Sequence, residues 1–178
     1  MSNQLTPLKI IIGVGILICL SIYGCKKENN TSAEDIHAAM LADVNALRST
    51  GCTCGTTYMP PVPPVKWNNI LETAAAEHAK DMYVNNYFSH IAPNGSSPIQ
   101  RAQADGYTGM YMGENIATGY NSVVQVMDAW EKSEDHCKAM MDSTYVDFGA
   151  ARYNSIWVQE FGRWHCIDPL NLSTSYIY

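Results

Sequence analysis

The first apolar segment of the chain is an almost unbroken run over residues 10–20, with polar residues on both sides. The run is shorter than the about 20 apolar residues that a membrane-spanning helix needs. It matches the apolar region of a signal peptide, which is about 7–15 residues long. The run leads to Gly24-Cys25, a junction typical of a bacterial lipoprotein, although Tyr23 departs from the usual small or apolar residue. We expect a signal peptide over 1–24 and a lipid on Cys25; an uncleaved anchor helix is the alternative.

Apolar positions at helical spacing predict the next elements. Ser32-x-x-Asp35 resembles a capping box, and an apolar stripe follows it, so we expect a helix that stops near Gly51. The proline-rich residues 58–65 must be extended, because proline fixes φ and has no N–H to donate. Asn68 or Asn69 can cap a second helix that runs to about Asn85. Further helices are expected after Ser97-Pro98, carrying Arg101, and after Ser122.

The pattern changes after Met141. Residues 148–153 and 156–161 are typical of two strands, and Asn154-Ser155 between them predicts a hairpin. Gly106-Tyr107 and Gly109 are expected to lead through a loop into Gly113-Glu114-Asn115. Helices followed by antiparallel strands indicate the α+β class.

Charge and motifs exclude several functions. The chain has 17 acidic and 11 basic residues and a net charge of −6, without a cluster of lysines or arginines, which argues against nucleic acid as a partner. It has neither His-Glu-x-x-His nor Gly-x-Ser-x-Gly, so no hydrolase signature is present.

Six cysteines are present, of which Cys19 lies in the signal segment. Cys25 would carry the lipid, so four cysteines remain for pairing: Cys52, Cys54, Cys137 and Cys166. Four is an even number, which suits disulfides in an exported protein. A bridge between Cys52 and Cys54 would be strained, which leaves the other pairings open. We favour Cys54 with Cys137 and Cys52 with Cys166. A zinc site is the competing interpretation, although Cys-x-Cys lacks the usual spacing.

The five histidines differ in context. His78 lies on the apolar stripe of the second helix and is best interpreted as a core histidine. His37 is expected to be solvated, and His165 has no acidic neighbours. His90 and His136 lie where a helix meets a loop, which is where clefts are usually built.

Several local motifs, taken together and in order, carry a family resemblance over roughly residues 36–162. They are Tyr87-Phe88-Ser89-His90, Pro93-Asn94-Gly95-Ser96, Gly113-Glu114-Asn115-Ile116-Ala117, Trp130 with Ser133-x-x-His136, and Trp157-Val158-Gln159-Glu160-Phe161-Gly162. By these motifs, the chain resembles the bacterial branch of the CAP superfamily, the SCP-like proteins. The resemblance implies a three-layer α-β-α sandwich with a central antiparallel sheet. It also implies a domain over residues 36–166, between a polar tether at 25–35 and a tail at 167–178.

The resemblance further implies a cleft lined by His90, Glu114 and His136 that can bind a divalent metal, often zinc. Neutral imidazoles suit zinc, and a carboxylate can be a third ligand or position a water. Eukaryotic-type members carry a second glutamate where this chain has Ser133, which weakens a two-carboxylate mechanism. A structural polar network around Glu114 is the alternative.

We therefore expect a monomeric, lipid-anchored protein of the bacterial cell envelope that acts as a binding module rather than an enzyme. Its ligand would be a small hydrophobic molecule such as a lipid, another envelope component, or a protein partner. The alternatives are a metal-dependent hydrolase with Glu114 as general base, and a structural envelope protein with a vestigial cleft.

Overall fold

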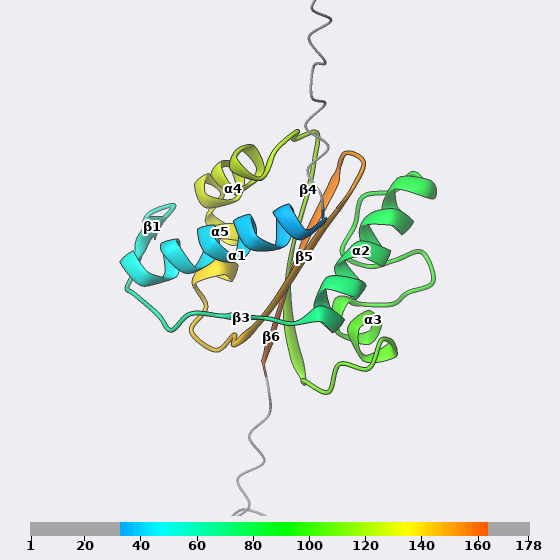
Figure 1. Cartoon of the computed structure of the whole chain (residues 1–178), viewed down its shortest axis with the longest axis horizontal. Helices are drawn as coiled ribbons and strands as arrows, with labels where there is room; N and C mark the ends of the chain where they lie inside the picture. Colours follow the sequence, from blue (N-terminus) through cyan, green and yellow to red (C-terminus); the bar gives the residue numbers. More distant parts are fainter. Residues whose placement is uncertain (1–32, 164–178) are drawn as a thin grey trace, which may run out of the picture. The chain divides into compact units, whose positions relative to one another are not determined.

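Four strands form the central sheet of the computed structural model, which describes residues 33–163 (Figure 1). They are β3 (Lys66–Trp67), β4 (Tyr111–Thr118), β5 (Asp147–Tyr153) and β6 (Ile156–Arg163), in the order β3-β5-β6-β4. The three long strands pair antiparallel, as expected, and the two-residue β3 pairs in parallel with β5. This order leaves β4 at one edge of the sheet, a position that matters for the functional site.

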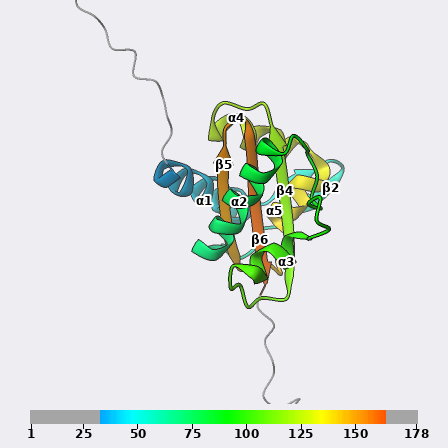
Figure 2. The ribbon, with the colours of Figure 1, turned by 90° about the vertical axis from the view of Figure 1, so that its right-hand side faces the viewer.

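Helices cover both faces of this sheet (Figures 1 and 2). One layer contains α2 (Asn69–Val84) and α3 (Pro98–Ala104). The other contains α1 (Ala33–Thr50), α4 (Val123–Lys132) and α5 (Glu134–Met141). The expected three-layer α-β-α sandwich is therefore confirmed. None of the helices within residues 33–163 is long and apolar enough to cross a membrane. The expected signal peptide, Cys25, His165, Cys166 and the C-terminal tail lie outside the described residues.

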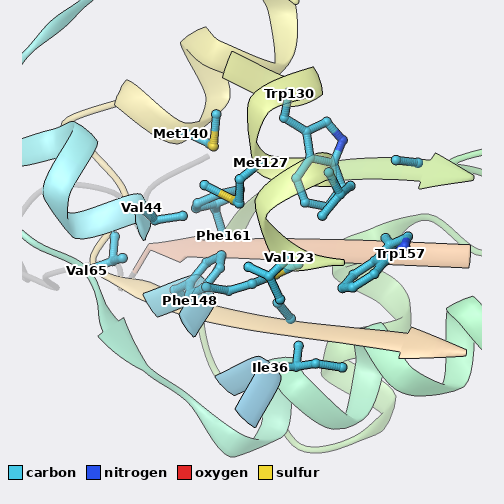
Figure 3. Close-up of a cluster of buried hydrophobic side chains, with 14 of the residues drawn as sticks. Ile36, Val44, Val65, Val123, Met127, Trp130, Met140, Phe148, Trp157 and Phe161 are labelled. Atoms are coloured by element: carbon cyan, nitrogen blue, oxygen red, sulfur yellow. The ribbon is translucent and has the colours of Figure 1, made fainter. Parts of the chain in front are cut away.

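The main core lies between the sheet and the layer of α1, α4 and α5. Figure 3 shows side chains of α4 directed toward aromatic residues of β5 and β6. Its members include Met40, Val44, Met127, Trp130, Phe148, Trp157 and Phe161, all at most 7 % exposed. Burying large apolar side chains of this kind stabilises the fold by about 1.5–3 kcal/mol each.

The opposite face of the sheet packs closely against α2. Its buried residues include Ala74, Ala75 and Ala79, in keeping with the close helix-to-sheet packing expected from its alanines. Gly149 of β5 completes this contact, because a Cβ there would overlap the backbone nitrogen of Glu72. Even an alanine at position 149 would push α2 away from the sheet.

Local sequence signals place most helix starts correctly. The Asn68 side chain accepts hydrogen bonds from the backbone N–H of Ile70 at 3.0 Å and of Leu71 at 3.3 Å, which caps α2 as predicted. Gln100 reaches back to accept from the Ser97 backbone N–H at 2.9 Å and begins α3. The predicted β5–β6 hairpin is also present, with Asn154 at φ 52° in its turn.

Other features were missed or wrongly predicted. Gly113-Glu114-Asn115 lies within β4, a strand that was not predicted and that forms by pairing with β6. A small hairpin of β1 (Cys52–Cys54) and β2 (Thr57–Met59) was not predicted. His37 is not fully solvated, since its ring stacks on that of Trp67 at a centroid distance of 3.7 Å.

Arg48 joins several segments at the end of α1. Its side chain is fully buried and donates to the carbonyl oxygens of Pro63 at 2.8 Å, Met140 at 2.7 Å, Asp142 at 3.0 Å and Tyr145 at 3.2 Å. These bonds hold the proline-rich segment and the end of α5 against α1. Burial lowers the pKa of the guanidinium, but arginine keeps its charge in proteins.

Candidate functional site

Glu114 is the centre of the candidate site. Its side chain is only 1 % exposed, and its carboxylate contacts three basic side chains. Oε1 lies 2.6 Å from Nδ1 of His90, and Oε2 lies 2.5 Å from a terminal nitrogen of Arg101. Nε2 of His78 is 3.7 Å from the same Oε2. A buried carboxylate is stable only when it is paired in this way.

Arg101 connects the carboxylate to the loop that carries His90. Its other terminal nitrogen donates to the backbone carbonyls of His90 at 2.9 Å and Ser96 at 3.1 Å. Because α3 begins at a capping box and includes a proline in its first turn, Arg101 is presented from a well-defined helix. The sequence placed Arg101 on this helix but did not indicate a role in the site.

His78 takes part in the same network. Its ring is buried, and Nε2 lies 3.0 Å from the backbone carbonyl of Ser89, so the predicted core histidine is satisfied. Burial lowers its pKa, which favours a neutral ring donating to Ser89. His78 thereby anchors the segment just before His90.

A second carboxyl group, on Glu160, lies directly opposite Glu114 in the β4–β6 register and is fully buried. Burial, followed by the negative charge of Glu114, raises the pKa of Glu160 well above its usual value. Neither carboxyl oxygen of Glu160 has a hydrogen-bond partner within residues 33–163, and an unpaired buried charge is costly, so the neutral acid is favoured. We therefore treat Glu160 as neutral. Arg101, 3.8 Å away, opposes this shift without cancelling it.

His90 is the exposed member of the site, with 52 % of its side chain accessible. Its hydrogen bond to Glu114 raises its pKa, and burial of part of the ring opposes this effect. Since a carboxylate only accepts, Nδ1 of His90 is the donor. Within residues 33–163, Nε2 of this ring has no hydrogen-bond partner.

His136 reaches the site from the other helical layer. Successive residues of a strand face opposite sides, so Glu114 faces α2 and α3 while Asn115 faces α5. The Asn115 side chain donates to the backbone carbonyl of His136 at 3.2 Å and so attaches the start of α5 to β4. Nδ1 of His136 lies 2.7 Å from the hydroxyl of Ser133. Burial, and then the positive charge of His90, lowers the pKa of His136.

His90 and His136 thus come from opposite layers and are close enough for the charge of His90 to lower the pKa of His136, while His90 is in direct contact with Glu114. The three predicted ligands do not form an ion-sized cluster as they stand. In the described part of the chain, ligand atoms from three residues lie within 4.8 Å of one another only at Cys52, Cys54 and Cys137.

A disulfide joins Cys54 of β1 to Cys137 of α5, the pairing we favoured. Cys137 directly follows His136, so this cross-link also restrains the histidine. Cys52 has no disulfide partner among the described residues, and its sulfur lies 3.6 Å from that of Cys137. The expected pairing of Cys52 with Cys166 involves a residue outside the described range.

Comparison with known proteins now identifies the family. The sequence profile of the cysteine-rich secretory protein family (CAP) matches residues 41–161, most of the chain. The chain belongs to the CAP family. It is 33 % identical to YkwD of Bacillus subtilis over 100 residues. The matched segment covers 55 % of this chain and 39 % of YkwD. The chain thus spans well under half the length of this curated relative.

Solved structures agree with this assignment. An extracellular protein of Bacillus anthracis that contains an SCP domain aligns with a TM-score of 0.64 and 28 % identity, over 71 % of this chain and 39 % of that one. An outer surface protein of Borrelia burgdorferi aligns with a TM-score of 0.65 and 20 % identity, over 75 % of this chain and 96 % of that one. The second likeness supports the CAP fold alone.

Proposed function

We propose that this CAP protein is an extracytoplasmic binding module whose His90 and His136 hold a divalent metal, zinc in the first place, at the edge of β4. One observation carries the proposal. In both rings Nδ1 is engaged by a side chain, while Nε2 has no hydrogen-bond partner among the described residues. Neutral imidazole nitrogens are common zinc ligands.

The role of Glu114 follows from its contacts. A carboxylate that accepts from the distal nitrogen of a metal-bound histidine orients the ring and increases its basicity. Glu114 has this relation to His90, and its second oxygen is held by Arg101. We therefore assign Glu114 to orienting a ligand rather than to being the third ligand. Two protein ligands would leave positions on the metal open for water or a small envelope ligand.

The hydrolase alternative has weaker support. A general base must reach the attacking water with a free acceptor. Glu114 is only 1 % exposed, and its two oxygens already accept from His90 and from Arg101, so the carboxylate is poorly placed to take a proton from an attacking water. These contacts favour binding over hydrolysis.

An extracytoplasmic location and a lipid on Cys25 are part of the proposal. They are supported by the apolar run ahead of Gly24-Cys25 and by the extracellular SCP-domain relative from Bacillus anthracis. In cells, Cys25→Ser should move the protein from the membrane fraction to the soluble fraction. Membrane retention of this variant would argue instead for an uncleaved anchor helix.

Calorimetric titration with Zn²⁺ tests the metal site. It should be done without reductant, so that the Cys54–Cys137 bridge excludes metal binding by those sulfurs. We expect one bound zinc, an affinity lowered at least tenfold in His90→Ala and in His136→Ala, and a loss of about 10–100-fold in Glu114→Gln. His37→Ala is the matched control and should bind as the wild type does. Unchanged zinc affinity in both site variants would exclude the proposed site.

A further inference from the structure

A second hollow lies outside the metal site, where α2 ends beside the β5–β6 turn. We call it the α2-end groove. It has a volume of about 580 Å³, within the range of about 300–1,000 Å³ for small-ligand sites. Its walls combine three aromatic side chains, Tyr83, Tyr87 and Phe88, with three neutral polar side chains, Asn86, Thr118 and Ser155.

The aromatic wall is exposed, and two of its three rings are fixed in place. Phe88 is 49 % exposed and Tyr83 is 47 % exposed. The ring of Tyr83 packs edge-on against Tyr153 at 5.5 Å, and the Tyr87 hydroxyl donates to Asp81. Tyr83 and Tyr87, held in this way, can contact a ligand at little cost in conformational entropy.

The polar wall offers hydrogen-bonding groups that the fold does not use. The side chains of Asn86, Thr118 and Ser155 make no hydrogen bond within residues 33–163. Asn86 is held in the left-handed region at φ 52°, and the Gly119 backbone N–H donates to the Ser155 carbonyl at 3.1 Å, which joins the two loops. The side chains that line the groove carry no charge.

These properties select the chemistry of the ligand. A purely apolar chain would cover the three polar side chains and leave them unpaired, which costs free energy. An ionic ligand would find no opposite charge in the lining. A sugar ring suits both walls, because its C–H faces are apolar and can pack on aromatic rings while its hydroxyls pair with amide and hydroxyl side chains.

We propose that the α2-end groove binds a neutral sugar unit of a glycan chain. The sugar packs against Tyr83 and Phe88, and its hydroxyls hydrogen-bond to Asn86, Thr118 and Ser155. This site is separate from the metal site, although Phe88 lies two residues before His90. Glycan binding therefore needs no metal, and either proposal can fail without the other.

Calorimetric titration with chitotetraose and with cellotetraose, in the presence of EDTA, tests this inference on the full chain. We expect saturable binding of at least one of the two, weakened at least tenfold in Tyr83→Ala and in Phe88→Ala. Thr118→Val keeps the shape of the side chain and removes its hydroxyl, so it should weaken binding severalfold. Tyr58→Ala is the matched control, because Tyr58 is an exposed aromatic residue of β2 (64 % exposed) that does not line the groove.

Circular dichroism and thermal melting establish that each variant is folded. Absence of saturable binding of both oligosaccharides would overturn the proposal. So would wild-type affinity in a folded Phe88→Ala variant, or an equal loss in Tyr58→Ala. Binding of phosphatidylcholine vesicles that Phe88→Ala abolishes, without binding of either glycan, would reassign the groove to lipid.

Discussion

Removing the Cys54–Cys137 disulfide should cost this domain a large part of its stability. The two half-cystines are 83 residues apart in sequence, and both are fully buried. In the chain-entropy description, a cross-link restrains the unfolded chain by an amount that grows with the logarithm of the loop length. For a loop of this length the relation gives about 4.5 kcal/mol at 25 °C. Domains are commonly stable by only about 5–15 kcal/mol in total.

The measurement needs a background free of the other sulfurs. Cys52 lies 3.6 Å from the sulfur of Cys137 and could replace Cys54 as its partner. We therefore compare C52A/C166A with the quadruple variant that also carries C54A/C137A. Urea unfolding followed by circular dichroism should show a free energy of unfolding lower by about 4–5 kcal/mol in the quadruple variant. Its melting temperature should fall by roughly 10–20 °C.

Two outcomes would refute this reasoning. A loss below about 1 kcal/mol would mean that the cross-link does not restrain the unfolded chain as calculated. In the wild-type background, Cys54→Ala should cost less than Cys137→Ala. Cys52 lies 3.6 Å from the Cys137 sulfur and 3.7 Å from the Cys54 sulfur, but a bridge between Cys52 and Cys54 would be strained and would close too short a loop to restrain the unfolded chain. Equal losses, with no Cys52–Cys137 bridge detected by mass spectrometry, would contradict the arrangement of the three sulfurs.

Three further predictions concern ionisable side chains. The folded pKa of Glu160 is raised, so its stabilising contribution is complete below its unfolded pKa and is lost as pH rises toward the folded value. Glu160→Gln should therefore be more stable than the wild type at pH 8 but not at pH 4. Parallel curves of unfolding free energy against pH for the two proteins would contradict a buried neutral acid. Arg48→Met should lower the free energy of unfolding by about 3–5 kcal/mol, because it leaves four carbonyl oxygens without their donor. Urea unfolding checks this prediction. A change below about 1 kcal/mol would show that the carbonyl oxygens find other partners. Zinc affinity should weaken as pH falls through the raised pKa of His90, because Nε2 of this ring must be unprotonated to bind the metal. In Glu114→Gln the loss of affinity should move to lower pH. Calorimetry at several pH values checks this, and an unshifted pH profile in the variant would show that Glu114 does not act on this ring.

Local signals in the sequence were sufficient for elements that are stabilised locally. The Asn68 cap, the capping box at Ser97 and the Asn154 turn each depend on hydrogen bonds or backbone angles within a few residues. Apolar spacing identified the core faces of the helices for the same reason, and a set of short motifs in order indicated the family. These features require no knowledge of which distant segments meet.

The partners of Glu114 could be decided only by the tertiary structure. Gly113-Glu114-Asn115 lacks a strand pattern, yet pairing with β6 makes it a strand and sets Glu160 opposite Glu114. Arg101 and His78 reach the same carboxylate from two helices, while His136 approaches the other side of the edge strand. Composition and periodicity specify most of the helices, their apolar faces and the β5–β6 hairpin. The sheet register and the packing of its two helical layers decide which buried charges share a site, because those contacts join residues far apart in the chain.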